Sequence, residues 1–558
     1  MKPITAVLLI GLLVPAAATP AEDLKQELER DVVLRAMVDE LARNQANLEL
    51  EDLERPYFIE YALADVSGAY VSAELGAVTG RHEARSRSLR ADVRVGSYKL
   101  DNTNFGGGYG GYWWSFYGGY GRAAAIPIED DYNAIRQAIW WATDRDYKSV
   151  VEALVQKKAF MESKLIKDKP DDFSRESPAV YLEERLDPTV DVERLERTAL
   201  VLSEILREYP DVKESAAYAT GGGGNKYLVN TEGTRIRTSA MYFSVSVNAT
   251  VQADDGMELS DSFTVHGRTW EDLPPLDELA QRCRKMITRL IAVKNAPMMA
   301  EPYTGPVLFE PEAAAAIFSQ QFSSHFPGGQ PTVGSGRDAD DFANKLGRRI
   351  LPRFLRVVDD PAQETIAGKP IMGHYVYDDQ GVKARAVVLV EGGRLKTQLM
   401  SRNPSKEFNQ STGHGRGLYG PSASIGCLIV TADPASNAEE LKEELFDACQ
   451  DEGLEYGIRI AALGGYGSNP LVMYQVYPDG REELVRGAQI ADIDLKAFKR
   501  MLAIGDSPYV LNSGGRTEGA TVVAPAMLFE ELDLAKIDRD FDKPPILPTP
   551  LARDGRAE

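Results

Sequence analysis

Stretches in which apolar and polar residues alternate one by one recur along this 558-residue chain. They cover residues 64–78, 86–98 and 234–251, and the turns beside the first two contain Gly76 and Gly80. Side chains of a β-strand point alternately to its two faces, so this pattern is typical of antiparallel strands with one buried face. The chain therefore has to build antiparallel sheets.

Helical spacing of apolar residues separates these strand-like stretches. It occurs in residues 23–50, 132–167, 192–209, 276–293, 311–325 and 438–452. Asp130-Asp131 and Asn437 stand directly before two of these ranges, where their side chains can cap the first turn. Helices and strands that follow one another in this irregular order predict an α+β fold.

The domain boundary is expected at residues 297–306, where the composition shifts to Pro, Met and small residues. The predicted organisation is a signal peptide in residues 1–21, an N-terminal α+β domain in residues 22–300 and a C-terminal domain in residues 301–558. Two long α+β halves fit this length as well as three or four smaller units.

The first residues resemble a secretory leader. Lys2 supplies a positive start, residues 4–14 are apolar, and small residues follow, with cleavage expected after Ala18 or Ala21. The alternative is an uncleaved anchor, but the run is shorter than the about 20 residues that a membrane span needs. We expect a periplasmic or secreted protein with no stable membrane insertion after cleavage.

Charge excludes one class of partner. The chain carries 63 Lys and Arg against 84 Asp and Glu, a net charge of −21. Neutralising phosphates requires clustered basic residues, so nucleic acid is not an expected partner. The cysteines, Cys283, Cys427 and Cys449, lack metal-type spacing. We expect small buried side chains there, or one disulfide pair in an oxidising compartment.

Residues 106–121 combine many glycines with Tyr, Trp and Phe. Such glycine density disfavours regular structure. One interpretation is a loop whose exposed rings bind a sugar, a peptide or a partner. The other is a surface insertion that folds on itself.

Several other patterns favour structural roles. Asp359-Asp360 and Asp378-Asp379 are paired carboxylates, but Pro or Gln-Gly follows each pair, which favours turns over acid/base catalysis. The glycine run 221–224 does not open a helix and is expected to be a hinge or hairpin loop.

Short motifs of the second half, in their order, resemble the TldD/PmbA family, once described as modulators of DNA gyrase. These motifs are GPVLF (305–309) before an alanine-rich helix, VDDP (358–361), YDDQGV (377–382), VEGGRL (390–395), STGHGR (411–416), RG (486–487), IGD (504–506) and VAPAMLF (523–529). The first half is similar to the family more loosely, through VNTEGT (229–234).

The resemblance implies a two-domain α+β fold, with antiparallel sheets and packed helices, that dimerises around a chamber in which a peptide lies as an extended strand. Catalytic members carry His-Glu-x-x-x-His on a helix and a distant Cys. Two imidazoles and a thiolate leave one zinc position for a water that the Glu deprotonates.

The corresponding stretch here is residues 320–325, in which Gln320, Gln321 and His325 stand at the motif positions. A second His is missing, Gln cannot act as a general base, and residues 504–515 contain no Cys. We therefore predict no metal site and no cofactor, although catalytic relatives use zinc. His414 and Arg416 lie in the loop that the resemblance places near the chamber, where Arg416 can grip a carboxylate.

Three functions remain open. The first is a non-catalytic, PmbA-like subunit that holds an extended peptide and pairs with a catalytic TldD-type chain or with itself. The second is an active metallopeptidase whose site is rebuilt from other residues. The third is an envelope binding protein that captures its ligand with residues 106–121.

Overall fold

The computed structural model describes residues 20–49, 54–106, 123–335, 342–464, 469–491, 493–515, 518–538, 541–543, 545, 547 and 549–551. The predicted signal peptide and the glycine/aromatic segment lie almost entirely outside these ranges. No helix within them is long and apolar enough to cross a membrane.

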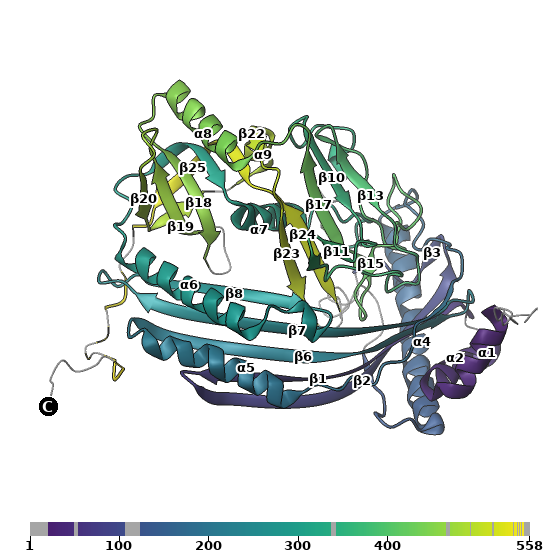
Figure 1. Ribbon diagram of the computed structural model, residues 1–558. Coiled ribbons are helices and arrows are strands. Elements are labelled where there is room, and N and C mark those ends of the chain that lie inside the picture. Colours follow the sequence, from purple (N-terminus) through teal and green to yellow (C-terminus); the bar gives the residue numbers. More distant parts are fainter. Residues whose placement is uncertain are drawn as a thin grey trace, which may run out of the picture.

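A long curved sheet forms the N-terminal half of the molecule (Figure 1). Its strand order is β3-β2-β1-β6-β7-β5, with β4 paired to β2 and β8 paired to β7. The strands are β1 (Pro56–Glu74), β2 (Ala77–Ser97), β3 (Leu100–Asp101), β4 (Ala124–Ala125), β5 (Val180–Leu182), β6 (Val212–Asn230), β7 (Arg235–Gln252) and β8 (Glu258–Gly267).

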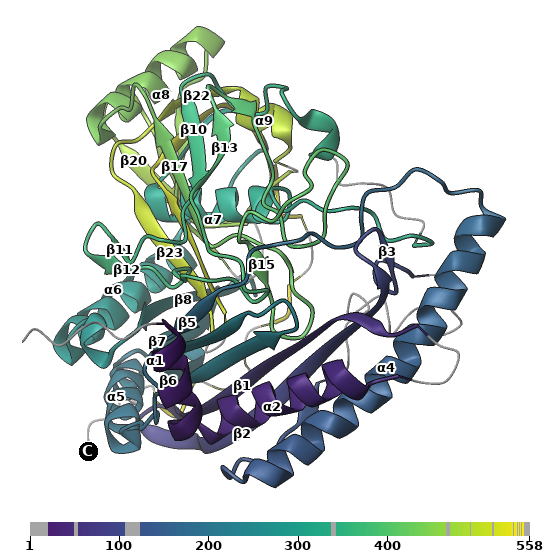
Figure 2. The same ribbon diagram turned by 90° about the vertical axis from the view of Figure 1, so that its right-hand side faces the viewer.

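Helices cover the apolar side of this sheet in two blocks. At one end, Leu63 and Leu89 pack against α2 and α4, which lie beside β1 and β2 in Figure 2. At the other end, Val71 and Val247 pack against α5 and α6, which lie along the sheet in Figure 1. The helices are α1 (Pro20–Arg30), α2 (Val32–Asn47), α4 (Tyr132–Ser163), α5 (Val192–Ile205) and α6 (Leu276–Asn295), with the short 3-10 helices η1 (Leu206–Glu208) and η2 (Trp270–Asp272).

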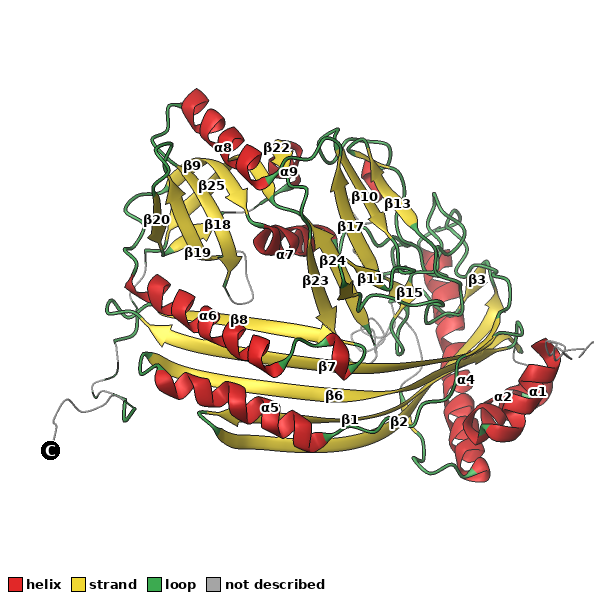
Figure 3. Ribbon diagram, in the orientation of Figure 1, coloured by secondary structure: helices red, strands yellow, loops and turns green. Residues whose placement is uncertain are grey.

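Two further sheets build the C-terminal half (Figure 3). One has the order β14-β13-β10-β17-β24-β23, and the other has the order β20-β19-β18-β9-β25-β21 with β22 on β25. The strands of the first are β10 (Leu355–Asp359), β13 (Val387–Glu391), β14 (Arg394–Leu395), β17 (Cys427–Ala432), β23 (Tyr509–Gly514) and β24 (Gly519–Ala524). Those of the second are β9 (Tyr303–Phe309), β18 (Gly457–Leu463), β19 (Pro470–Val476), β20 (Glu482–Val485), β21 (Ala488–Ile490), β22 (Met501–Ile504) and β25 (Met527–Lys536).

Helix α7 (Pro311–Phe322) lies between the two C-terminal sheets (Figure 1). Its Phe318 and Phe322 are fully buried in one apolar cluster with side chains from both sheets. The remaining elements are α8 (Ala438–Glu452), α9 (Leu495–Lys499), η3 (Ala343–Lys345) and two small pairs, β11 (Thr365–Ile366) with β12 (Lys369–Pro370) and β15 (Gly415–Arg416) with β16 (Ser422–Ala423).

The predicted α+β architecture is confirmed, together with several local details. Asp131 caps α4 by accepting the Ala134 N–H at 2.7 Å, and Asn437 caps α8 in a capping box with Glu440. All three cysteines are free and buried, as the sequence predicted for small core side chains.

The prediction for the glycine run 221–224 is wrong. These residues are not a hinge or hairpin loop but lie in the middle of β6. The glycines permit close approach there: a Cβ on Gly221 would stand 2.8 Å from Val190 Cγ1, and one on Gly223 would stand 2.4 Å from the Ala240 carbonyl oxygen. Close packing of distant segments, rather than a need for local flexibility, explains why glycine occupies these positions.

Two apolar segments of the second half are not continuous strands. Residues 371–377 form turns and a single bridge rather than a strand. Residues 521–529 do not form one strand, because β24 ends at Ala524 and β25 begins in another sheet at Met527. Apolar content alone did not distinguish strands from buried irregular segments.

Candidate functional site

The degenerate motif lies at the C-terminal end of α7. The helix ends at Phe322, so His325 lies beyond it, with its Nδ1 3.2 Å from the Ser324 hydroxyl and its ring 5.1 Å from that of Phe342. The Gln321 amide donates a hydrogen bond to the Ile493 carbonyl. Gln320 lies on the exposed side of the helix.

These side chains do not fit the zinc ion that the resemblance implies. In the described ranges no group of three or more His, Cys, Asp or Glu is placed to hold a metal ion. At the motif positions themselves, the side chains are one imidazole and two amides, and an amide cannot accept a proton from a water as a carboxylate would. Burial raises the pKa of Cys449 to about 11 and that of Cys427 further, which keeps these distant thiols protonated.

His414 and Arg416 lie at different depths. His414 is fully buried, with Nε2 3.2 Å from Asp359 Oδ1 and Nδ1 3.0 Å from the Thr412 hydroxyl. The same Asp359 carboxylate accepts the N–H groups of Gly426 and Cys427. The His414 side chain is therefore enclosed by the protein, whereas the Arg416 side chain lines a pocket.

That pocket, of ≈ 400 Å³, lies between the N-terminal sheet and the loops of the C-terminal half. Its sheet wall comes from β6 and β7, and the opposite wall comes from residues 372–377, Asp379, Arg416 and the turn before β24. The full lining is Val66, Glu183, Gly224, Lys226, Thr238, Ser239, Ala240, Met241, Tyr242, Arg268, Met372, His374, Tyr375, Val376, Tyr377, Asp379, Arg416, Gly515, Glu518 and Gly519.

Arg416 has donor capacity left for a ligand. Its guanidinium lies 4.2 Å from the centre of the Tyr375 ring, and Nη2 donates to the Gly519 carbonyl at 3.1 Å. Nη1 has no hydrogen-bond partner among the described residues. A carboxylate is the natural acceptor for such a nitrogen.

Nearby carboxylates are already occupied by internal donors. Asp379 is 2.9 Å from Lys226 Nζ and accepts the Gly417 N–H at 2.8 Å. Burial raises the pKa of Asp379, but Lys226 and Arg416 outweigh this effect and lower it overall. Asp378 is buried behind it, and burial raises its pKa to about 7 although three backbone N–H groups favour its charged form. The Asp378 and Asp379 side chains thus make the turn contacts that the sequence predicted.

The pocket also exposes an unpaired length of strand edge. On the side of β7 away from β6, β5 pairs only with residues 235–237, and β8 pairs only from Phe243 onward. Residues 238–242 between them belong to the pocket wall. Since alternate residues of an antiparallel strand direct N–H and C=O to the same side, Ser239 and Met241 direct theirs away from β6.

One of these outward groups has an internal partner. The Glu183 carboxylate accepts the Ser239 N–H at 2.7 Å. The Ser239 carbonyl and both backbone groups of Met241 have no hydrogen-bond partner among the described residues. Such an edge can add an extended peptide through main-chain hydrogen bonds.

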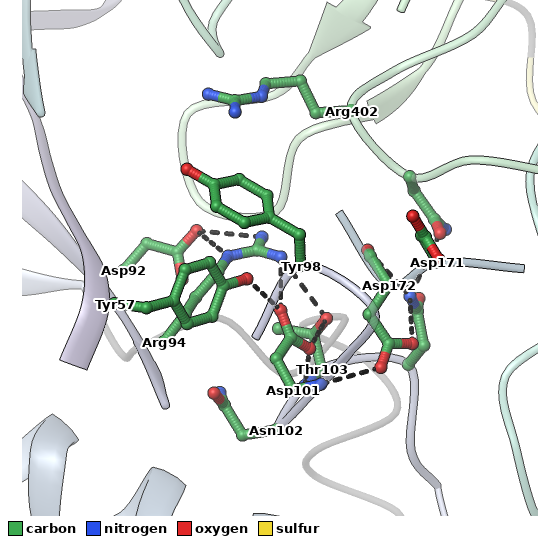
Figure 4. Close-up of polar contacts among 12 residues, drawn as sticks. Tyr57, Asp92, Arg94, Tyr98, Asp101, Asn102, Thr103, Asp171, Asp172 and Arg402 are labelled. Carbon is green, nitrogen blue, oxygen red and sulfur yellow. Dashed lines mark hydrogen bonds and ion pairs between the residues drawn. The ribbon is translucent and has the colours of Figure 1, made fainter. Parts of the chain in front are cut away.

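A buried network of charges joins the two halves beside the pocket, and Figure 4 shows its N-terminal part together with Arg402. Arg402 of the C-terminal half bonds Glu232 through both terminal nitrogens at 2.8 Å and also donates to the Ser174 carbonyl. Arg402 and Arg94 lie 3.9 and 3.6 Å from the centre of the Phe173 ring. The Arg402 N–H donates to the Gln380 side chain, next to Asp379, so the network positions the pocket loop.

The N-terminal part of this network surrounds Asp101 and Asp172. Figure 4 shows Arg94 between Asp92 and Asp101, with the Tyr57 hydroxyl also donating to Asp101. Lys157 on α4 pairs with Asp172 at 2.7 Å, and both side chains are fully buried.

Sequence reasoning named Arg416, which lines this pocket, but it did not point to the edge of β7, to Glu183 or to the Arg402 network. The sequence feature that could have pointed to this part of β7 was the glycine run 221–224. It lies opposite residues 240–243 of β7 and was interpreted as a loop.

Comparison with known proteins agrees with this architecture. The model of the PmbA/TldA metallopeptidase central domain matches residues 183–291, and that of the PmbA/TldA metallopeptidase C-terminal domain matches residues 302–536. The two-domain α+β fold and the matched domains define a metallopeptidase-like protein. The chain belongs to the PmbA/TldD family.

Individual relatives are distant. A metalloprotease of Methanocaldococcus jannaschii is 30% identical over 176 residues, which is 30% of this chain and 34% of that protein. One of Methanothermobacter thermautotrophicus is 23% identical over 309 residues, which is 53% of this chain and 61% of that protein. The chain thus spans about a third to three fifths of the length of these relatives.

Solved structures share the fold. TldE from Thermococcus kodakarensis superposes with a TM-score of 0.58 at 15% identity, covering 90% of this chain and 100% of the other. A Thermotoga maritima protein described as a candidate modulator of DNA gyrase has a TM-score of 0.59 at 15% identity, covering 90% of this chain and 99% of the other. At this identity the likeness concerns the fold alone.

Proposed function

We propose that this protein is an exported, non-catalytic PmbA/TldD-family chain that holds an extended peptide along β7. In this role it acts as the partner of a catalytic TldD-type chain or pairs with itself. The observation that carries the proposal is the unpaired edge at residues 238–242, which opens into a pocket beside a guanidinium nitrogen without a partner.

The pocket chemistry supports a peptide as the ligand. Main-chain hydrogen bonds to Ser239 and Met241 do not depend on peptide sequence, so they suit a protein that accepts varied segments. Arg416 then adds one charge-assisted contact, to a C-terminal or side-chain carboxylate. In the middle of the sheet wall, Gly224 and Ala240 are paired and leave room for a peptide backbone to approach.

The non-catalytic part of the proposal rests on the donors at the end of α7. Gln321 is engaged with a backbone carbonyl, and His325 lies outside the helix. The motif positions in residues 320–325 carry neither the carboxylate base nor the second imidazole that the zinc mechanism uses. Export to the periplasm rests on the leader-like residues 1–21.

Peptide binding is tested with a short, fluorescently labelled, unstructured peptide that ends in a free carboxylate. Met241→Pro removes the outward N–H, and Met241→Leu is the matched control that keeps it. A lost hydrogen bond weakens binding by about 1 kcal/mol, so a roughly fivefold higher Kd is expected for the proline variant only. Arg416→Gln is expected to weaken binding by about tenfold or more, and an amidated peptide should abolish that difference.

Two results would overturn the proposal. Binding that is unchanged in both Met241→Pro and Arg416→Gln would remove the edge as the site. Stoichiometric zinc in the purified chain, together with cleavage of unfolded protein that a chelator stops, would establish a rebuilt peptidase instead.

A further inference from the structure

A second pocket lies on the helix-covered side of the long sheet, between its two helical blocks. On β1, Leu63 belongs to the apolar cluster under α2 and α4, and Ala69 belongs to the cluster under α5 and α6. Side chains alternate along a strand, so Asp65 and Ser67 lie on the same side, between the two clusters. They line a pocket of ≈ 610 Å³. We call it the charged pocket, after Asp65, Arg85, Asp130 and Arg185 in its wall.

The charged pocket is separate from the pocket beside β7. Asp65 and Asn225 line the charged pocket, whereas their chain neighbours Val66 and Gly224 line the other one. Successive residues of a strand point to opposite faces of a sheet. The sheet therefore stands between the two pockets, and a ligand of one does not occupy the other.

The remaining walls are two loops that the sheet holds in place. Arg87 Nη1 donates to the carbonyls of Pro127 and Glu129 at 2.8 and 3.1 Å, in the segment before α4. The Asn225 side chain exchanges two hydrogen bonds of 2.8 Å with the backbone of Leu186, in the segment before α5. Walls that are fixed in advance lose little conformational freedom when a ligand binds.

Two carboxylates orient three guanidiniums at the inner wall. Asp65 accepts from Arg85 Nε and Nη2 at 3.3 and 3.2 Å, and from the fully buried Arg87 at 2.6 Å. Asp130 accepts from Arg87 at 2.7 Å and pairs with Arg185 Nη2 at 2.9 Å. Burial raises the pKa of Asp130, but hydrogen bonds from Arg87 and Arg185 outweigh this effect and lower it overall. Asp130 is therefore charged at neutral pH and holds Arg185 in place.

Arg85 and Arg185 keep N–H groups that a ligand can use. Their side chains are 44% and 30% exposed. Within the described ranges, Arg85 contacts Asp65 through Nε and Nη2, and Arg185 contacts its carboxylates through Nη2. The two Nη2 atoms lie 3.2 and 3.9 Å from the same oxygen, Asp65 Oδ2. They are thus close enough for one ligand carboxylate to accept hydrogen bonds from both guanidiniums.

Two further carboxylates line the pocket without internal donors. Glu129 and Asp187 are exposed, and their side chains make no hydrogen bond or ion pair with the described part of the chain. A ligand ammonium group is the natural partner for them. With Asp65 and Asp130 they outnumber the three arginines, and the whole chain carries a charge of −21. This balance repels a simple anion but not a molecule with one charge of each sign.

Stability does not explain why charges occupy this part of the sheet. Buried ion pairs usually stabilise a fold no more than well-packed apolar side chains of similar volume. Apolar residues in place of Asp65 and Arg87 would join the two clusters and close the gap between them. The pocket also has apolar parts, from Ile128, Leu186 and Pro188.

We propose that the charged pocket binds a small zwitterion, an α-amino acid with an apolar side chain. Arg85 and Arg185 hold its carboxylate, Glu129 and Asp187 hold its ammonium group, and the apolar parts of the wall receive its side chain. The volume is within the about 300–1,000 Å³ that is usual for small-molecule pockets. This site is additional to the proposed peptide site.

Isothermal titration calorimetry of the whole chain with L-phenylalanine tests the proposal. Two analogues each lack one charge: 3-phenylpropionate has no ammonium group, and 2-phenylethylamine has no carboxylate. Each should bind at least about tenfold more weakly than L-phenylalanine, because it loses charge-assisted hydrogen bonds. Absence of L-phenylalanine binding at millimolar concentration, or equal affinity for 3-phenylpropionate, would overturn the proposal.

Variants assign the two charges to their partners. Arg185→Gln should weaken L-phenylalanine binding by about tenfold, whereas Arg481→Gln, at a 60% exposed ion pair of the C-terminal half, should not. Glu129→Gln should weaken binding of L-phenylalanine but not of 3-phenylpropionate, which also verifies that this variant is folded. Equal affinities in Arg185→Gln and Arg481→Gln would contradict the assignment. Binding of the labelled peptide should be unchanged in Glu129→Gln, so the two sites are tested separately.

Discussion

Replacing Lys157 by methionine tests whether the buried charge network stabilises the fold. Lys157 Nζ pairs with Asp172 at 2.7 Å and donates to the carbonyls of Asp101 and Thr103. Neither side chain of the pair is exposed. Met fills a similar volume but leaves Asp172 and two carbonyls without their ammonium partner.

The expected loss follows from these contacts. Removing one partner of a buried ion pair typically destabilises a protein by about 3–5 kcal/mol. Asp172 keeps Lys169 at 2.8 Å and the Asp101 N–H at 2.9 Å, which places the expected loss near the lower end, about 3 kcal/mol. The next residue supplies the control. Lys158 also lies 2.7 Å from a carboxylate, that of Glu54, but the two side chains are 46% and 51% exposed.

Urea unfolding followed by far-UV circular dichroism measures both variants without the ionic screening that guanidinium introduces. Lys158→Met should lose at most about 1 kcal/mol, because exposed ion pairs contribute little. A double variant, Lys157→Met with Asp172→Asn, should be less destabilised than the sum of the two single changes. Equal losses for Lys157→Met and Lys158→Met would refute the reasoning that burial sets the contribution.

Two other predictions concern the glycine run and the pocket loop. Gly221→Val places a branched side chain where even a Cβ would stand 2.8 Å from Val190 and 3.0 Å from Phe243. Thermal denaturation should therefore show that the free energy of unfolding falls by about 1–3 kcal/mol. Replacement of a hinge glycine, by contrast, would be tolerated. Asp378 has a pKa of about 7 in the folded chain, above the about 4 of an unfolded Asp. Protonation therefore favours the fold, and stability should fall by a few kcal/mol as pH rises from about 4 to about 7 and then level off. Asp378→Asn should flatten that slope in a pH series of urea titrations; an unchanged slope would assign it to another group.

Local sequence chemistry predicted several features correctly because short segments decide them. The caps Asp131 and Asn437 act within their own first turns, and alternation in residues 64–78 and 86–98 led to the hairpin of β1 and β2. The absence of His-Glu-x-x-x-His in residues 320–325 is likewise a property of the sequence. These features need no knowledge of distant neighbours.

Other predictions failed because distant contacts override local preference. Glycine disfavours strands, yet residues 221–224 form the centre of β6 because the side chain of Val190 and the backbone of β7 come too close for a Cβ. His414 and Arg416 are two residues apart, and the resemblance placed both near the chamber. The structure buries His414 just before the two-residue strand β15, where it contacts Asp359 of β10, whereas Arg416 in β15 lines the pocket.

The sequence alone determined the α+β class, the family resemblance and the absence of the His-Glu-x-x-x-His motif from residues 320–325, because composition, periodicity and motif order carry that information. Only the tertiary structure decided that β7 has an open edge, since this depends on where β5 and β8 stop pairing with it. Strand pairing joins residues far apart in the chain, and no local pattern encodes which edges and faces it leaves uncovered.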